Sequence, residues 1–273
     1  MTPLEQRILE QVERPTDSLD DTSRQVFEEL IRELERGTVR AAEPKDDSWE
    51  VRAWVKQGIL LGFRLGSMID YSVGDHFHFR DKSTFPPQDV TQHGVRVVPG
   101  GTMVRSGAYV AAGVVIMPPS YINVGAYVDE GSMVDSHALV GSCAQVGRRV
   151  HLSAGAQLGG VLEPVGARPV LIEDDVFVGA LSGVFEGVRV CKGAVIASGV
   201  ILTASTPIFD LPNQRWIRSE SGHAPEIPEN AVVVMGSRPV DSGESGVLLN
   251  CPVIVKYRDA GTDERTALEE ALR

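Results

Sequence analysis

The sequence is poor in aromatic residues and in cysteine. Phe, Trp and Tyr make up 6% of its 273 residues, whereas glycine occurs 28 times. Globular cores usually rely more heavily on large rings, so something other than aromatic burial must organise this chain. The three cysteines, Cys143, Cys191 and Cys251, are an odd number without C-x-x-C spacing. This argues against a disulfide framework or a zinc knuckle, and we expect small packing residues rather than nucleophiles.

Basic residues and long apolar runs are also scarce. Lys and Arg total 26 against 37 Asp and Glu, a formal charge of −11, which argues against a general nucleic-acid binder. Apolar runs such as residues 58–63 are too short to cross a bilayer. The segment 1–14 lacks the apolar centre of a signal peptide. We therefore expect a cytoplasmic protein with no nucleic-acid or membrane partner.

Residues 1–95 are expected to form an N-terminal helical domain. Asp20 opens a cluster that can cap a helix, and Gly37 can end that helix. Residues 49–61 predict a short strand or loop that leads into a third helix, and 67–95 is expected to be irregular. Two stretches have apolar residues at helical spacing, namely Leu4, Ile8, Leu9 and Val12, and Val26, Leu30, Ile31 and Leu34.

From residue 98 onward, branched aliphatic residues recur at every sixth position. Small residues and glycine fill many of the positions between them. This period fits neither an amphipathic helix nor alternating strands, and it is typical of the hexapeptide repeat of a parallel β-helix. The runs are Val98, Val104, Val110, Ile116, Ile122, Val128, Val134, Val140, Val146, Leu152 and Leu158; then Ile172, Val178, Val184, Val190, Ile196, Leu202 and Ile208; then Ile227 and Val233.

Three hexapeptides make one triangular coil of 18 residues, and coils stack at about the ordinary strand spacing of 4.8 Å. We predict a mainly β fold: a left-handed parallel β-helix over residues 96–240, preceded by the helical domain. The repeat breaks at 163–169, an expected bulging turn, and at 209–226, an expected external loop. Residues 241–273 are expected to form a short C-terminal extension containing a strand at 248–255 and a helix at 262–272.

Side chains alternate along a strand, so a residue directly after an inward aliphatic points outward. Asp135 follows Val134 in this way, and Ser153 lies one coil above it. His137 is expected near a corner of the same coil. An outward carboxylate beside a corner imidazole could form a site, although most outward polar residues on a solenoid are merely solvated. Asp129 competes with Asp135, because it follows an inward valine on the adjacent wall.

The histidines raise a metal-binding alternative. His76 and His78 form an H-x-H pair, but no further Cys or His stands at ligand spacing. His137 and His151, 14 residues apart, are expected on different walls and could meet across a trimer interface, as in hexapeptide-fold carbonic anhydrases. The other open alternatives are a hexapeptide acyltransferase acting on another amine, a sugar or serine, and a non-catalytic solenoid.

The segment 125–164 closely resembles tetrahydrodipicolinate N-succinyltransferases. The similarity rests on GAYVDEGSMVD at 125–135, VGSCAQVG at 140–147, VHLS at 150–153 and GGVLEP at 159–164, and it extends over most of the chain. It implies a homotrimer that transfers succinyl from succinyl-CoA to the amine of 2-amino-6-oxopimelate, the ring-opened form of tetrahydrodipicolinate. It also implies an acyl-CoA co-substrate, no tightly bound cofactor and no metal.

The resemblance also implies roles for individual residues. The substrate-binding arginine corresponds to Arg96, and the substrate-binding aspartate, a candidate general base, corresponds to Asp135. Further substrate contacts are expected at His137, Ser153 and Ser182. Coenzyme A is expected along the outer wall, at Gly179, Ala180, Ala197, Ser198 and Lys256.

Several positions depart from the family pattern. The family usually has tryptophan where this chain has His137, and arginine and glutamate where it has Leu181 and Gly183. The pattern Trp-Leu-Lys-Lys-Ala has become Trp-Val-Lys-Gln-Gly at 54–58, and a basic residue usually found near Pro207 is missing. A lost arginine removes a group that could hold a carboxylate. We therefore expect an altered acyl donor or acceptor: acetyl-CoA as donor, or a specialised pathway such as tabtoxin-type biosynthesis.

Overall fold

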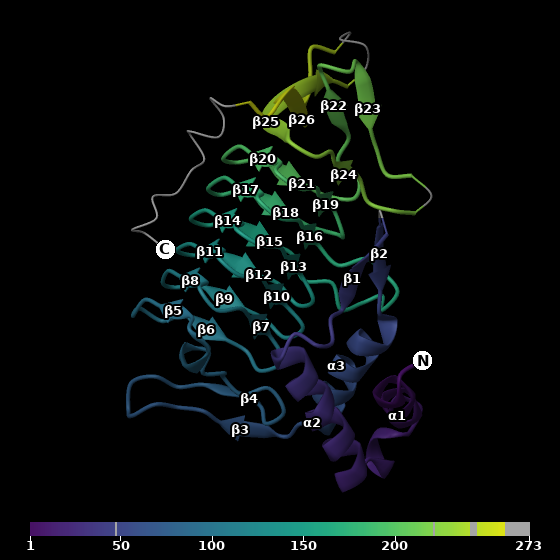
Figure 1. Ribbon diagram of the computed structural model, residues 1–273, viewed down its shortest axis with the longest axis vertical. Helices are drawn as coiled ribbons and strands as arrows, with labels where there is room; N and C mark the ends of the chain where they lie inside the picture. Colours follow the sequence, from purple (N-terminus) through teal and green to yellow (C-terminus); the bar gives the residue numbers. More distant parts are fainter. Residues whose placement is uncertain (47, 221, 241–244, 260–273) are drawn as a thin grey trace.

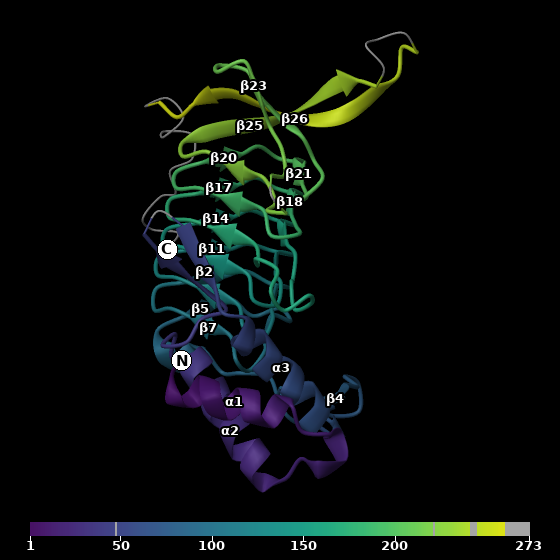
Figure 2. The same ribbon diagram turned by 90° about the vertical axis from the view of Figure 1, so that its right-hand side faces the viewer.

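The computed structural model describes residues 1–46, 48–220, 222–240 and 245–259. Three helices, α1 (Pro3–Val12), α2 (Asp21–Glu35) and α3 (Ala53–Leu65), form the N-terminal part, with short 3₁₀ turns at Thr16–Ser18 and Thr91–His93. They lie at one end of a tall stack of strands (Figures 1 and 2). The expected helices of this region are confirmed.

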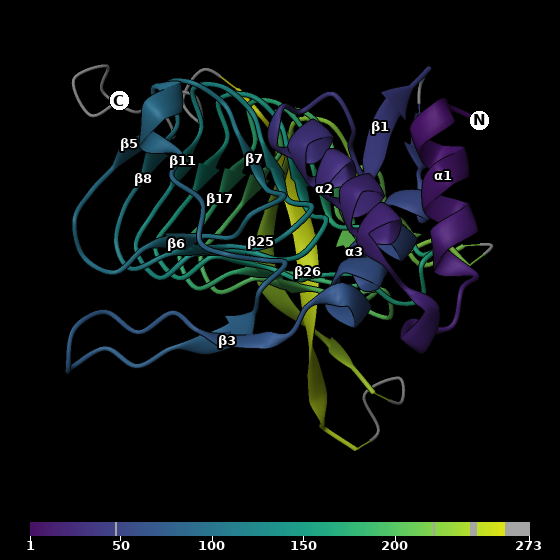
Figure 3. The same ribbon diagram turned by 90° about the horizontal axis from the view of Figure 1, so that it is seen from below.

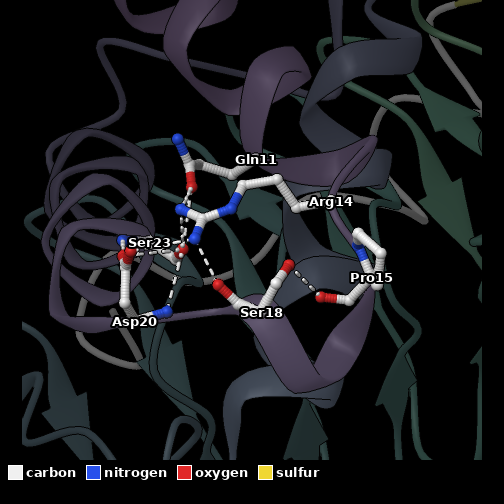
Figure 4. A network of polar contacts seen from close by, with 6 residues as sticks. All are labelled: Gln11, Arg14, Pro15, Ser18, Asp20 and Ser23. Carbon is white, nitrogen blue, oxygen red and sulfur yellow. Dashed lines mark hydrogen bonds and ion pairs between the residues drawn. The ribbon is translucent and has the colours of Figure 1, made fainter.

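Local sequence explains where these helices start and how closely they pack. Asp20 caps α2, as expected, and accepts a hydrogen bond from the Ser23 N–H. Arg14 joins this cap to the end of α1 through hydrogen bonds to Gln11, Ser23 and Asp20 (Figure 4). Gly62 lets α3 approach α2, because a Cβ there would lie 2.2 Å from the Phe27 ring.

Two small hairpins complete this region. β1 (Ala42–Lys45) pairs with β2 (Ser48–Val51), and β3 (Met68–Asp70) pairs with β4 (Arg80–Lys82). The second hairpin lies in the segment that we expected to be irregular, and it projects from the body of the molecule (Figure 3). Its outer residues Met68, Val73, Phe77 and Phe79 are exposed, so no buried alternation in the sequence indicated strands there.

From residue 96 the chain winds into a three-walled prism of two-residue parallel strands. Successive strands occupy successive walls, and the chain turns in the left-handed sense as it rises (Figure 3). The predicted left-handed parallel β-helix is confirmed. Wall 1 contains β7 (Tyr109–Val110), β10 (Tyr127–Val128), β13 (Gln145–Val146), β16 (Leu171–Ile172), β19 (Arg189–Val190) and β24 (Glu226–Ile227).

Wall 2 is the largest and carries most of the predicted site residues. It contains β5 (Arg96–Val97), β8 (Val115–Ile116), β11 (Met133–Val134), β14 (His151–Leu152), β17 (Phe177–Val178), β20 (Val195–Ile196) and β25 (Ala231–Pro239). Wall 3 contains β6 (Met103–Val104), β9 (Tyr121–Ile122), β12 (Leu139–Val140), β15 (Gln157–Leu158), β18 (Gly183–Val184) and β21 (Ile201–Leu202).

The aliphatic residue of each hexapeptide fills the prism, as the repeat predicts. From Val104 to Val233 these residues are at most 5% exposed and belong to one core cluster. The first position is an exception: Val97, not Val98, pairs with Ile116. The spacing from Val97 to Val104 is therefore seven positions instead of six. The turn accommodates the additional residue at Gly100 and Gly101, whose φ angles are 147° and 94°.

The C-terminal end of the prism is closed by four strands. β25 pairs antiparallel with β26 (Leu248–Tyr257), and β26 pairs parallel with β22 (Ile208–Asp210), which pairs antiparallel in turn with β23 (Arg215–Ile217). The segment 209–226 thus holds a strand pair rather than only an external loop. Strand β26 covers the strand expected at 248–255, whereas the helix expected at 262–272 lies outside the described residues.

Candidate active site

Wall 2 brings most of the predicted site residues onto one outer face. Arg96 lies in β5, in the same outward column as Met133, His151 and Phe177 of higher coils. The residues that follow the inward aliphatics form a second outward column. It consists of Asp135, Ser153, Gly179 and Ala197, in successive coils. The spacing of the repeat is sufficient to place Asp135, Ser153, Gly179 and Ala197 on one surface, whereas Arg96 was assigned through the family resemblance.

Asp135 has one carboxylate oxygen fixed and the other available. Its Oδ1 accepts a hydrogen bond from the Ser136 N–H at 2.7 Å, while its Oδ2 lies 3.9 Å from Nε2 of His151. The side chain is 30% exposed, so an external ligand can reach it. An ionised carboxylate anchored by its own turn in this way can accept a proton from a bound substrate.

Above Asp135, the second column has only small side chains. Ser153, Gly179 and Ala197 leave a shallow strip, which we call the wall 2 strip, and Ala180 and Ser198 flank it at the next positions of their coils. Gly179 needs to be glycine, because a Cβ there would lie 2.5 Å from the Ser198 nitrogen and 2.7 Å from the Ala197 carbonyl carbon.

The corner after wall 2 carries two of the residues that depart from the family pattern. His137 and Leu181 both adopt left-handed backbone angles, with φ of 62° and 58°, and such angles are uncommon for bulky side chains. Leu181 is 74% exposed, and its side chain lies over Gly155, where a Cβ would meet Leu181 Cδ2 at 2.8 Å. The corner column after wall 2 therefore presents an exposed imidazole beside Asp135 and an exposed apolar side chain two coils above it.

Two of the predicted contacts lie away from this surface. Ser182 points into the prism, is 1% exposed, and donates a hydrogen bond to the Ala197 carbonyl. This gives Ser182 a structural role, and we leave it out of the site. Lys256 lies on β26 opposite Val232 of β25, beyond the top of the wall 2 strip, and its Nζ contacts Asp259 Oδ2 at 2.8 Å.

Sequence reasoning missed the contact of His151 with Asp135. It placed His137 and His151 on different walls, but His151 begins the wall 2 strand β14 and His137 forms the corner that closes the same wall. The signal that could have revealed this contact is the spacing of 16 residues between Asp135 and His151. In an 18-residue coil, this spacing puts His151 diagonally above Asp135.

Asp129, the competing candidate, lies on wall 1. Its Oδ2 is 3.6 Å from Arg148 Nε, and it borders a cleft of about 490 Å³ between that wall and the β1–β2 hairpin. In this cleft Arg189 pairs with Glu173 at 2.7 Å, and Trp49 Nε1 donates a hydrogen bond to the same carboxylate at 3.0 Å. Wall 1 is thus held against the N-terminal region.

The cysteines lie in packed surroundings. Cys143, Cys191 and Cys251 are all buried and free, and burial raises the pKa of both the Cys143 and the Cys191 thiol to about 12. Such thiols stay protonated near neutral pH and are poor nucleophiles. Within the described part of the chain, no group of three or more His, Cys, Asp or Glu residues could hold a metal ion.

Comparison with known proteins supports the resemblance seen in the motifs. The family model for the N-terminal region of tetrahydrodipicolinate N-succinyltransferases matches residues 3–65, and a model for the hexapeptide repeat of succinyltransferases matches 169–204. The 2,3,4,5-tetrahydropyridine-2,6-dicarboxylate N-succinyltransferase of Ralstonia nicotianae is 45% identical over 251 residues, covering 89% of this chain and 87% of its own.

Two further relatives carry the same name. The Psychrobacter arcticus enzyme is 46% identical over 92% of this chain and 90% of its own. The Cupriavidus taiwanensis enzyme is 42% identical over 100% of this chain and 99% of its own. The chain belongs to the tetrahydrodipicolinate N-succinyltransferase family. It is therefore an enzyme of the acyltransferase class, and the recognition made from the motifs is confirmed.

One solved structure also matches this chain, at lower sequence identity than the relatives named above. A crystal structure of a Campylobacter jejuni protein, described as a candidate 2,3,4,5-tetrahydropyridine-2-carboxylate N-succinyltransferase, matches with a TM-score of 0.47 and 17% identity. The match covers 84% of this chain and 62% of that chain. Among the described residues, no helix is long and apolar enough to span a membrane.

Proposed function

We propose that this family member is a CoA-dependent N-acyltransferase that acylates the amine of 2-amino-6-oxopimelate, the ring-opened form of tetrahydrodipicolinate, or of a close analogue. The observation that carries the proposal is the wall 2 strip with Asp135 at its foot. Three coils separate Asp135 from Ala197, about 14 Å at the ordinary strand spacing. The small side chains along this distance leave room for the extended arm of an acyl-CoA beside the carboxylate.

Each step of the reaction has a group on this face that suits it. The substrate ammonium loses a proton to Asp135, and the freed nitrogen attacks the thioester carbonyl carbon. Backbone N–H groups of the coils stabilise the oxyanion, and the carbon–sulfur bond then breaks to release coenzyme A. Arg96 suits a substrate carboxylate, which a guanidinium can hold with two hydrogen bonds. No covalent acyl-enzyme is required.

The acyl donor is succinyl-CoA or acetyl-CoA. Relatives named N-succinyltransferases favour succinyl, whose terminal carboxylate calls for a nearby cation. Two coils above Asp135, however, the corner residue Leu181 and the wall 3 residue Gly183 supply no charge, and this favours an uncharged acetyl group. Steady-state kinetics with both donors on one acceptor decide between them: a strong preference for succinyl-CoA would exclude acetyl-CoA.

Substitution on the strip tests where the acyl-CoA lies. Ala197→Trp should raise the KM for acyl-CoA by tenfold or more, because the indole would fill the strip, and should leave the KM for the amine nearly unchanged. Lys192→Trp places the same side chain before the same strand, β20, at an exposed corner off the strip, and serves as the control. Equal effects of the two variants would remove the strip from the proposed function.

The family resemblance also motivates the assembly and the pathway in this proposal. We propose a cytoplasmic homotrimer that acts in lysine and diaminopimelate biosynthesis or in a derived pathway of the tabtoxin type. The missing basic residue near Pro207, together with His137 and Leu181, favours a derived pathway. The genes next to this one would distinguish the two pathways. Lysine-biosynthesis genes there would support the first, and a specialised-metabolite cluster would support the derived pathway.

A further inference from the structure

A histidine with no role in the proposed reaction lies beside its candidate base. Because Leu152 points inward, the preceding residue of β14, His151, points out of wall 2. Its ring lies one coil above Met133 and one coil below Phe177. Phe177 packs edge-on against the imidazole, with ring centroids 5.1 Å apart and an interplanar angle of 80°. The aromatic contact and the wall hold the ring in a defined orientation.

The imidazole is more enclosed than the carboxylate that it faces. The His151 side chain is 16% exposed against 30% for Asp135, and both ring nitrogens are buried. Nε2 lies 3.9 Å from Asp135 Oδ2, the oxygen that the Ser136 N–H does not hold. Asp135 is therefore the more accessible of the two groups to a substrate.

The carboxylate and the imidazole differ in proton affinity, and this difference bears on the proposed reaction. An ordinary carboxylate has a pKa of about 3.9 and an ordinary imidazole one of about 6.5, so a carboxylate alone holds a substrate proton poorly at neutral pH. Overall, the ammonium gives up two protons: one reaches the departing thiolate, and the other must leave the site. An imidazole next to the carboxylate can take that second proton and return it to solvent through the more exposed carboxylate once the products have left.

We propose, building on the proposed function, that His151 is a positioning residue and proton acceptor that acts through Asp135. The proton passes from the substrate nitrogen to Asp135 Oδ2 and from there to His151 Nε2, while the ionised carboxylate stabilises the resulting imidazolium. Arg149 and Asp175, at the corner before β14 and β17, bind each other through hydrogen bonds of 2.6 and 2.9 Å, and Arg258 donates a hydrogen bond to the Asp175 carbonyl.

Kinetics as a function of pH test this role. In the wild type, kcat/KM should rise with pH as the coupled pair loses its proton. His151→Gln should lower kcat about 10- to 100-fold, change KM by less than threefold, and move the acidic limb to lower pH. Met133→Leu, in the same column, is the packing control and should leave the limb in place. An unchanged kcat and acidic limb in His151→Gln would overturn the proposal.

A second measurement does not depend on turnover. NMR titration of the His151 imidazole should give a lower pKa in Asp135→Asn than in the wild type, because the variant loses the charge that stabilises the imidazolium. Equal titrations in the two proteins would show that the groups do not act as a pair. If the folded wild type transfers no acyl group at all, the proposed function fails, and this titration still decides the pairing.

Discussion

At the scale of single residues, Asp135 is the group on which the proposed reaction most depends. Replacing Asp135 by Asn keeps its shape but removes the base, so kcat should fall by about 100-fold or more, with a much smaller change in the KM for the amine. Asp129→Asn is the matched control, since Asp129 follows an inward valine on wall 1 in the same way. Undiminished acyl transfer in Asp135→Asn would contradict the assignment.

Sequence patterns were sufficient to predict the placement of Asp135 and Ser153 but not their surroundings. The period of six fixes which side of a wall a residue faces, so the column of Asp135, Ser153, Gly179 and Ala197 was predictable. The substrate contact expected at Ser182 came from the family resemblance, which does not say where a side chain points. The hexapeptide repeat places Ser182 on the inside of the prism. Leu181 lying over Gly155 depends on a rotamer, which no sequence period determines.

At the scale of secondary-structure elements, the cap between α1 and α2 is predicted to depend on pH. Hydrogen bonds from Arg14 and from the Ser23 backbone lower the pKa of Asp20 below its ordinary value of 3.8. A group with a lowered pKa contributes stability that is present above pH 3.8 and is lost as the pH falls through the lower, folded-state pKa. The cap should therefore weaken only in acid.

The comparison of wild type with Asp20→Asn measures this effect. Asparagine keeps a capping oxygen but cannot pair with Arg14 as an ion. The variant should melt at a lower temperature than the wild type above pH 4, and the difference should shrink as the pH is lowered toward 2. A difference in melting temperature that stays constant over this range would exclude the ion pair as its source.

The prism core makes a separate prediction about stability. Leu152 is fully buried in the middle of the stack, and Leu152→Ala should lower the free energy of unfolding by about 2–5 kcal/mol, through lost burial and the cavity left behind. Ile201→Ala, at an exposed outward position of wall 3, should change it by less than about 1 kcal/mol. Chemical denaturation measures both, and similar losses would contradict the inward and outward assignment.

The sequence predicted some secondary-structure elements better than others. The prism strands repeat one rule, so their walls and order followed from the spacing alone. Only Ile208 of β22 and Val233 of β25 continue the hexapeptide repeat, and the pairings among β22, β23, β25 and β26 join residues between 5 and 44 positions apart. The β3–β4 hairpin keeps its apolar side chains on the outside, and a pattern based on burial cannot detect such strands.

At the scale of the whole molecule, exposed apolar residues support the proposed homotrimer. Phe77 on one projecting hairpin, Leu248 on another and Leu181 at the corner after wall 2 are 62%, 61% and 74% exposed. Surfaces of this kind commonly contact another protein. Light scattering on the purified protein should give three times the 29.5 kDa chain mass, and a monomer at micromolar concentration would contradict the assembly.

The composition of the molecule also follows from its architecture. A narrow triangular coil admits Val, Ile, Leu and Ala and favours glycine at its corners, which explains the few rings and the many glycines. The acidic balance says little about the substrate, because a few local cations such as Arg96 can bind anions against the net charge.

The most direct test of the central claim is thiol release from a panel of acyl-CoA donors, measured with and without the ring-opened amine. The account predicts release of coenzyme A that requires the amine, occurs with succinyl-CoA or acetyl-CoA, and is lost in Asp135→Asn. A folded wild-type protein that releases no thiol with any donor, or does so equally without the amine, would contradict it.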